Sequence, residues 1–469
     1  MAKKVLTAIA VLTMAMLAFA GCASTKWGPV PGASKDDPVK NNGGFLVEKG
    51  NYIYFINGVA DSTVDNTFGT PVQGAIVVAD KNDLKAEAKV VVPKAVVAGD
   101  KTAGIYIFGE WIYYATPNAN KDKNGEVQSS YLDFCRTKLD GTATETALYT
   151  SSNATPYRYA EIDGTVYLAY YESSSKNLVS YNFDTKKSTV IAEAVSGYTF
   201  STDEGYDSVY YTKLVDLDKD NEVTASYNKA YKLSFKGGDP VEVLSGVPKT
   251  VNGEAASSTG LVFTLKSHMK GALIYTASYV DNTTFRGGYV LKDTDVTADA
   301  VKNAEEKAFK LSAKDANFSS SLFAGFDDAG KPVGYVYSDT TYGLMLQQYG
   351  EDLPVRITTS TTTTLVSIEG GYVYFSTGDD FVRAALTDRD VAAKDLKVIT
   401  ENYYNTSWYK PEFVGNDIYY GDSTYGLHYV FRADLTAEEI KGALVGKYTE
   451  ADKKTAEEKI KEEQKAEKK

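Results

Sequence analysis

The chain has 469 residues, which is long for a single hydrophobic core, so either several domains or one large repetitive β architecture is expected. The composition favours the repetitive architecture, because 36 tyrosines and 38 glycines accompany abundant valine and threonine, a mixture typical of pleated strands joined by tight turns. The formal net charge of −12 argues against a nucleic-acid partner, because binding a phosphate backbone requires clustered lysine and arginine.

Residues 1–21 are predicted to be a targeting segment. Lys3 and Lys4 precede an apolar run over residues 5–18, and the tetrapeptide Phe19-Ala20-Gly21-Cys22 follows. Small residues directly before a cysteine resemble the lipobox of bacterial lipoproteins, although phenylalanine stands where leucine is commonest. The resemblance implies that Cys22 becomes the diacylated first residue of the mature chain and anchors it on the extracytoplasmic side of a bacterial membrane. A plain secretory signal is the alternative.

Residues 22–42 follow as a predicted tether from the membrane. Pro29, Pro31 and Pro38 stand there among polar residues, a composition that suits a flexible linker. The domain that carries the fold is therefore expected to begin at residue 43.

A β-branched residue followed by tyrosine recurs along residues 43–435. Most copies follow a turn-forming pair that contains glycine. The spacing of roughly 37 to roughly 65 residues is that of propeller blades and exceeds that of most helical repeats. The eight copies are Ile53-Tyr54, Ile112-Tyr113, Val166-Tyr167, Val209-Tyr210, Ile274-Tyr275, Val336-Tyr337, Val373-Tyr374 and Ile418-Tyr419.

Each interval divides into four short strands joined by hairpins. In the third interval, strands over residues 165–171, 178–183 and 189–194 are followed by residues 197–205, which lead to the next β-branched pair. The predicted fold is an all-β propeller with four-stranded blades, eight by the count of pairs or seven if two short units merge. Because the last copy supplies only two or three strands before residue 436, residues 43–48 or a nearby N-terminal segment are expected to complete the ring.

A family resemblance supports this fold. Arg136-Thr137-Lys138-Leu139-Asp140-Gly141-Thr142 looks like the R-x-x-L-D-G-[ST] strand and turn of YWTD-type, low-density-lipoprotein-receptor-like β-propellers, which also occur in bacterial lipoproteins. Tyr337-Ser338-Asp339 is similar to part of the YWTD tetrapeptide, but no complete copy occurs and eight blades exceed the six usual in that family. The resemblance covers about a third of the chain and implies no catalytic residue. Cys135, in the predicted strand 131–138, is expected to be a buried small hydrophobe.

Two insertions align with each other without a gap, at residues 120–131 and 216–227. Asp216, Asp218 and Asp220 place carboxylates at alternate positions, which resembles the start of a Ca²⁺ loop and makes them the candidate metal ligands. The acidic residue that would close such a loop is missing, since position 12 is tyrosine in both insertions. Polar hairpin turns between the second and third strands of blades 2 and 4 are the alternative.

Catalytic motifs are not recognised. The chain has two histidines, His268 and His428, and neither lies in a nucleophile elbow, so both are predicted to be ordinary surface or strand residues. Residues 201–205 match part of the Asp-box of sialidase-type propellers, but before a second strand, and are judged a chance match. A pair of carboxylates that meets only in space stays open.

Aromatic residues gather at Tyr403, Tyr404 and Trp408, in a loop expected to be exposed before the last blade. Exposed rings beside acids and amides give large contact area at low entropic cost, so these three residues are the candidate ligand-binding residues. Burial between blades is the alternative for any single tyrosine.

Residues 436–469 change to alanine, glutamate and lysine, and Thr455 with Glu458 predicts a helix start. This segment is therefore expected to be a charged helical tail, exposed to solvent or bound to a partner. The function expected for the whole chain is a membrane-anchored, non-catalytic binding or protein-interaction scaffold. Its partner would be an envelope protein or a glycan, and a surface glycan-binding protein or a carbohydrate-active hydrolase or lyase are the alternatives.

Overall fold

The computed structural model describes residues 29–58, 75–92, 104–117, 131–153, 156–215, 227–247, 250–251, 254–255, 259–280, 284–296, 307–404, 410–423 and 429–446. Within these ranges the regular structure is almost entirely β. The exceptions are the one-turn helix α3 (Asp315–Phe318) and the 3-10 turns η3 (Asp293–Asp295) and η5 (Ala393–Asp395).

The described strands form eight sheets in chain order and one separate ladder, β18 (Thr250–Val251) with β19 (Glu254–Ala255). The first four sheets are β1 (Val39–Lys40), β2 (Leu46–Lys49), β3 (Tyr52–Ile56), β4 (Ile76–Asp80) and β5 (Lys89–Val92); β6 (Tyr106–Phe108), β7 (Trp111–Pro117), β8 (Tyr131–Lys138) and β9 (Thr144–Asn153); β10 (Tyr157–Ile162), β11 (Thr165–Glu172), β12 (Asn177–Asn182) and β13 (Lys187–Ala192); and β14 (Gly197–Phe200), β15 (Ser208–Val215), β16 (Tyr227–Ser234) and β17 (Val241–Ser245).

The remaining four sheets repeat the same arrangement. They are β20 (Leu261–Met269), β21 (Ala272–Tyr279), β22 (Phe285–Lys292) and β23 (Phe309–Ser312); β24 (Leu322–Phe323), β25 (Gly334–Asp339), β26 (Gly343–Gln348) and β27 (Val355–Thr358); β28 (Thr364–Glu369), β29 (Tyr372–Thr377), β30 (Asp380–Ala385) and β31 (Lys397–Thr400); and β32 (Glu412–Val414), β33 (Asp417–Asp422), β34 (Tyr429–Asp434) and β35 (Ala443–Leu444).

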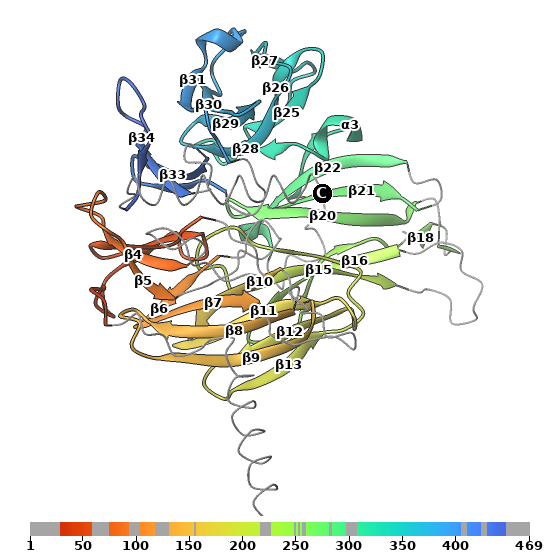
Figure 1. Cartoon of the computed structure of the whole chain (residues 1–469). Helices are drawn as coiled ribbons and strands as arrows, with labels where there is room; N and C mark the ends of the chain where they lie inside the picture. Colours follow the sequence, from red (N-terminus) through yellow and green to blue (C-terminus); the bar gives the residue numbers. More distant parts are fainter. Residues whose placement is uncertain are drawn as a thin grey trace, which may run out of the picture. The chain divides into compact units, whose positions relative to one another are not determined.

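This succession of antiparallel four-stranded blades is a β-propeller, with eight blades as predicted (Figure 1). Each β-branched–tyrosine pair lies in the second strand of its four-stranded repeat, from Ile53-Tyr54 in β3 to Ile418-Tyr419 in β33. The β-branched member is buried in all eight copies and the tyrosine in seven, Tyr167 being half-buried. Neighbouring positions of one strand point to opposite faces, so both faces of each second strand pack inside the protein.

Two-residue turns set the register of several blades. Lys270 and Gly271 join β20 to β21 with φ angles of 53° and 67°, and Asp163 and Gly164 join β10 to β11 with φ angles of 52° and 78°. Positive φ at both central residues defines the type I′ turn, whose twist matches that of the strands it connects. The glycine of the repeat is therefore a requirement of the backbone.

The chain divides into two compact units. Unit 1 comprises residues 1–174, 181–187 and 402–469, and unit 2 comprises residues 175–180 and 188–401. One hydrophobic cluster of unit 1 includes Leu46, Ile53 and Cys135, all fully buried, which confirms that Cys135 is a core side chain. Clusters around Leu273 and Phe375 form cores in unit 2.

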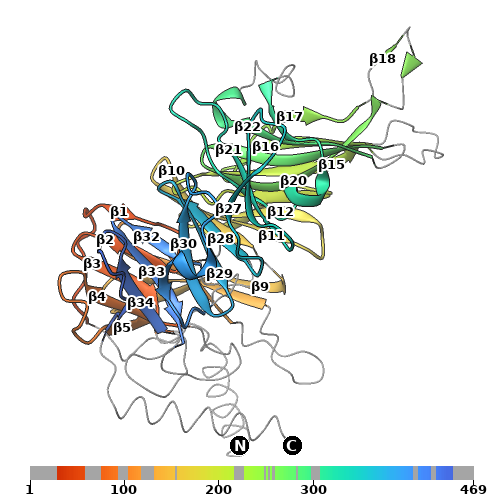
Figure 2. The same cartoon turned by 90° about the horizontal axis from the view of Figure 1, so that it is seen from above.

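The first and last blades lie side by side within unit 1 (Figure 2). Asn41 Nδ2 donates to the Phe413 carbonyl at 2.9 Å, and the Gly446 N–H donates to the Leu84 carbonyl at 2.8 Å. The last blade has four strands of its own, because β35 pairs with β34. The prediction that an N-terminal segment completes this blade is therefore wrong. The N-terminal segment instead adds β1 to the first sheet.

Two segment boundaries also differ from the sequence prediction. Residues 436–446, assigned to the helical tail, form turns and β35, because backbone pairing with β34 outweighs their charged composition. Residues 29–42, assigned to the tether, include β1 and hydrogen-bond to blades 1, 2 and 8, so the tether prediction fails there. The rest of the predicted tail, residues 447–469, lies outside the described residues.

Candidate functional site

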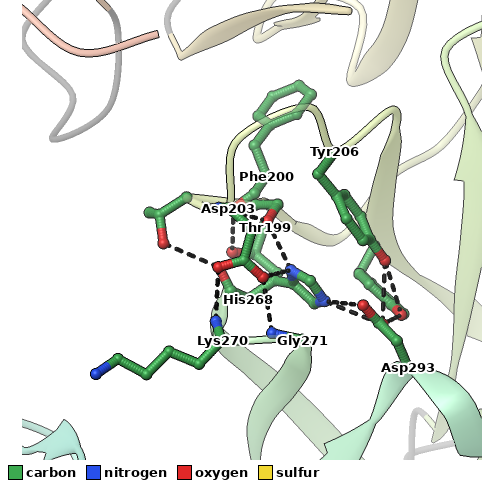
Figure 3. A network of polar contacts seen from close by, with 11 residues as sticks. Thr199, Phe200, Asp203, Tyr206, His268, Lys270, Gly271 and Asp293 are labelled. Carbon is green, nitrogen blue, oxygen red and sulfur yellow. Dashed lines mark hydrogen bonds and ion pairs between the residues drawn. The ribbon is translucent and has the colours of Figure 1, made fainter. Parts of the chain in front are cut away.

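The most elaborate polar cluster of the described residues surrounds His268 in unit 2 (Figure 3). His268 is near the end of β20, and Asp293 directly follows β22 in the same blade. Ser201, Asp203 and Tyr206 come from the connection between β14 and β15 of the preceding blade. The first-to-second-strand turns of two consecutive blades thus supply most of the cluster.

Both ring nitrogens of His268 are paired, and the side chain has no exposed surface. Nδ1 lies 2.7 Å from Ser201 Oγ, and Nε2 lies 3.0 Å from both carboxylate oxygens of Asp293. A neutral imidazole satisfies this pattern when Nε2–H donates to the carboxylate and Nδ1 accepts from the serine hydroxyl. Backbone pairing joins the same segments, since the Thr202 N–H donates to the His268 carbonyl at 3.0 Å.

Two tyrosines complete the surroundings of Asp293. Tyr210 donates to Asp293 Oδ1 at 2.5 Å and Tyr206 donates to the same oxygen at 3.1 Å. Their rings lie against the imidazole, with centroids 4.2 Å away for Tyr206 and 5.1 Å for Tyr210. The Lys232 ammonium lies 5.0 Å from the Tyr206 ring centroid and adds positive charge on this side.

Asp203 holds the turn that follows β20. Its carboxylate accepts the N–H of Lys270 at 2.6 Å and the N–H of Gly271 at 2.8 Å. Its own N–H donates to Ser201 Oγ at 2.9 Å. The Lys270 ammonium then donates to the Ile368 carbonyl at 2.8 Å, which extends the polar contacts to the end of β28.

These hydrogen-bond donors determine the pKa of Asp293. Burial acts to raise the pKa of Asp293, but hydrogen bonds from His268 and Tyr210 outweigh it and lower the pKa from 3.8 to about 2. Burial, together with the charge of Asp293, raises the pKa of both Tyr206 and Tyr210 well above the ordinary value. At physiological pH Asp293 is therefore a carboxylate anion that accepts hydrogen bonds from two neutral phenols.

Ser201, His268 and Asp293 have the order of contacts found in an acyl-transfer triad, in which an aspartate orients an imidazole that contacts a serine. Three observations favour a structural role. Ser201 is 5% exposed, its Oγ already accepts the Asp203 N–H, and the nearby N–H groups of Lys270 and Gly271 are bound to Asp203. An oxyanion would need donors of that kind. The geometry is that of a hydrogen-bonded link between two blades.

Of the residues predicted from sequence as site residues, Tyr403 and Tyr404 are described, and neither belongs to this cluster. Cys22, Trp408, His428 and the candidate metal ligands Asp216, Asp218 and Asp220 lie outside the described residues. The position of the acidic loop agrees with the prediction, because residues 216–226 connect β15 to β16, the second and third strands of blade 4. Within the described ranges no group of three potential metal-ligating side chains occurs, and no helix is long and apolar enough to span a membrane.

Tyr403 and Tyr404 are described, and the expectation of an exposed aromatic loop is wrong for Tyr403. Its side chain is 6% exposed, because Tyr403 forms an isolated antiparallel bridge with Asp422. Burial raises the pKa of Tyr403, as it does more weakly for half-buried Tyr404. A backbone hydrogen bond from Tyr404 to Gly421 holds the segment against β33 at 3.0 Å.

The sequence predicts His268 to be an ordinary surface or strand residue, and nothing in the sequence connects it with Ser201 or Asp293. Ser201 and His268 are 67 residues apart in the sequence, and His268 and Asp293 are 25 residues apart. The available signal was the repeat register. Ser201–Gly205 and Lys270-Gly271 both precede a second strand, so they occupy equivalent turns of consecutive blades.

No protein-family model and no curated protein sequence matches the chain. Solved structures resemble it at low identity. They include an oligogalacturonate lyase in complex with manganese (13% identity, TM-score 0.36, 77% of this chain and 82% of that chain), the β-propeller domain of the Trilobed protease from Pyrococcus furiosus (9%, 0.37, 77% and 94%) and TolB from Acinetobacter baumannii (12%, 0.26, 73% and 82%). At identities this low the resemblance shows the fold alone, and with TM-scores below 0.5 it supports no argument about function.

Proposed function

We propose that this chain is an extracytoplasmic lipoprotein, anchored to a bacterial membrane through Cys22, whose β-propeller acts as a non-catalytic binding or protein-interaction scaffold. The observation that carries the proposal is the N-terminal sequence, in which two lysines and an apolar run lead to Phe19-Ala20-Gly21-Cys22. A lipid on Cys22 would restrict the propeller to one membrane surface.

Two properties of the chain support a scaffold. A propeller displays many loops on a rigid frame, and rigid frames with variable loops are typical of binding modules. Internal hydrogen bonds link Ser201, His268 and Asp293, and the first two side chains are buried, so the array favours a structural role over catalysis. The negative net charge favours an envelope protein or a glycan over nucleic acid.

The experiment is affinity capture from intact crosslinked cells, comparing wild type with Cys22→Ala. Mass spectrometry identifies the bound material, and the mass of the N-terminal peptide reports acylation. The scaffold proposal expects acyl chains on Cys22 and a reproducible envelope protein whose recovery falls in the variant. An unmodified Cys22 contradicts the anchor, and recovery of no envelope protein contradicts the scaffold.

Glycan binding is the second candidate, and exposed aromatic side chains favour it. The exposed tyrosines among the described residues include Tyr149 at 51%, Tyr342 at 59%, and Tyr349 and Tyr372 at 37% each. Exposed rings provide stacking area for sugars and proteins alike. A carbohydrate array distinguishes glycan binding from protein binding. Tyr342→Ala is the test variant, and Leu353→Ala, at an exposed aliphatic residue, is the control.

Two further assignments stay as proposals. If the chain is a carbohydrate-active hydrolase or lyase, it should release reducing ends or unsaturated sugars from polysaccharides in a test panel. No release from any of these polysaccharides would contradict the enzymatic assignment. Calcium binding at Asp216, Asp218 and Asp220 predicts a calorimetric signal with Ca²⁺ that Asp218→Asn removes.

A further inference from the structure

The segment that precedes the first blade is bound to the protein surface. The Val30 N–H donates to the Asp140 carbonyl at 3.0 Å, and the Ala33 N–H donates to the Tyr54 hydroxyl at 2.9 Å. The buried Lys49 ammonium donates to the carbonyls of Lys35 at 3.0 Å and Asp37 at 2.8 Å. The free part of any membrane tether is therefore shorter than residues 22–42.

These contacts lie at one end of the strands in unit 1. Asp140 is in the turn between β8 and β9, and the Leu139 N–H donates to the Glu110 carbonyl at 3.0 Å, in the turn between β6 and β7. The Gly50 N–H, in the turn between β2 and β3, donates to the Pro38 carbonyl at 3.1 Å. We call the turns at Gly50-Asn51, Gly109-Glu110 and Asp140-Gly141 the turn end of unit 1.

The opposite strand ends carry the other connections. The chain leaves β3 at Ile56 and returns in β4 at Ile76, and it leaves β7 at Pro117 and returns in β8 at Tyr131. Because strands alternate in direction, these connections start at the end away from the turn end. A seven-residue strand such as β7 separates the two ends by about 23 Å.

Chain length limits how far the turn end can lie from a lipid on Cys22. Eight residue steps separate Cys22 from Val30, a span of at most about 28 Å when fully extended and about 16 Å on average for a flexible chain. The intervening sequence contains Lys26 and Trp27. Lysine is attracted to anionic lipid, and tryptophan favours the headgroup region, so both residue types shorten the effective reach.

We infer that the turn end of unit 1 faces the lipid bilayer, so that the strand ends at Ile56 and Pro117 face away from the membrane. The inference rests on the proposed lipid at Cys22. It identifies the lipid headgroup surface as the partner of the turn end of unit 1. A long tether would allow unit 1 to take any orientation relative to the membrane, whereas a tether of eight residues favours the orientation in which the turn end faces the bilayer.

Energy transfer to a membrane dye tests the orientation. One chain carries p-azidophenylalanine with a clicked donor in place of Asn51, at the turn end, and a matched chain carries it in place of Ser174, an exposed residue after β11 at the opposite end. Each full-length mature chain is reconstituted in vesicles that hold an acceptor on lipid headgroups. The inference expects transfer roughly twofold higher or more from position 51, given strands about 20 Å long.

A variant with a longer tether tests whether the short tether causes the difference in energy transfer. An insertion of about 24 glycine and serine residues after Ala23 is expected to reduce the difference between the two positions to near zero, because the anchor then no longer restricts orientation. Equal transfer from positions 51 and 174 with the natural tether, or higher transfer from position 174, would overturn the inference.

Failure of the lipid anchor is detected separately. The mass of the N-terminal peptide shows whether cells acylate Cys22. If they do not, the same two chains are coupled at Cys22 to a maleimide lipid, and the energy-transfer comparison still decides whether the eight-residue span orients the propeller.

Discussion

Two aspartates, buried Asp133 in unit 1 and half-buried Asp293 in unit 2, show opposite behaviour. Asp293 in unit 2 accepts hydrogen bonds from His268, Tyr206 and Tyr210, and its pKa is lowered to about 2. Asp133 in β8 of unit 1 is 2% exposed, and its Oδ1 has no hydrogen-bond partner among the described residues. Burial raises the pKa of Asp133 to about 6.

The difference shows that burial alone does not set the charge of a carboxylate. Desolvation disfavours the anion at both positions, and only at Asp293 do hydrogen bonds, from His268 and Tyr210, outweigh it. The same residue type therefore stabilises the fold at one place and destabilises it at another.

The largest change in stability is expected for His268→Ala. The substitution leaves Asp293 without its imidazole partner and Ser201 Oγ facing a cavity, so we expect a loss of about 3 to 5 kcal/mol in the free energy of unfolding. Urea unfolding followed by tryptophan fluorescence measures it. Ser201→Ala is the control, because it keeps the imidazole–carboxylate pair, and a loss of about 1 kcal/mol is expected. Equal losses in the two variants would show that the imidazole–carboxylate pair is not the stabilising element.

Asp293→Asn removes the charge while nearly preserving the shape. Because the folded pKa of Asp293 lies below the ordinary 3.8, its contribution to stability is present above about pH 4 and is lost as the pH falls towards 2. We expect the variant to be about 2 kcal/mol less stable at pH 7 and equal to wild type near pH 2. A constant difference across that range would contradict the assigned pKa.

Asp133→Asn should act in the opposite direction. The folded pKa of Asp133 lies above 3.8, so the folded state binds more protons and stability falls as the pH rises from about 4 to about 6. The shift corresponds to about 3 kcal/mol, but a buried amide also lacks partners, so we expect a net gain on the order of 1 kcal/mol at pH 7. The gain should disappear below pH 4 in unfolding titrations, and a loss at pH 7 would show that the Asp133 carboxylate is paired.

Tyr206→Phe makes the smallest change. It removes one of the donors to Asp293 Oδ1 and the hydrogen bond to the Tyr210 hydroxyl, so we expect a loss of about 0.5 to 1 kcal/mol. The acid limb of the unfolding curve should also move towards higher pH, because the anion has fewer donors. Tyr342→Phe, at an exposed tyrosine, is the control and should change neither quantity.

The repeat was predictable from sequence because its signals are local. Ile274-Tyr275 follows a glycine turn directly, and a period of two determines which side chains share a face. The prediction failed at Ala443–Leu444 and at residues 29–42, where polar composition suggested a tail and a tether. Pairing with β34 and with β2 decided those segments, and composition does not report such pairing.

The candidate site was less predictable. His268 is one of two histidines in the chain, and residues 201–205 match part of a known motif, but nothing in either stretch indicates that they meet. Tyr403 was expected to be exposed because it belongs to an aromatic run, and its bridge to Asp422 buries it instead.

By itself the sequence determined the four-stranded blade and the turns that require positive φ, because strand alternation and turn chemistry depend on residues next to each other in the chain. It favoured eight blades but left seven open, and the structure decided for eight. It also contains the basis for the proposed anchor at Cys22. Only the tertiary structure decided that Asp293 is an anion that accepts hydrogen bonds from three donors, while Asp133 Oδ1 has no partner in the part of the chain that the structure describes. Desolvation and hydrogen bonding depend on side chains contributed by neighbouring strands and blades, which sequence proximity does not specify.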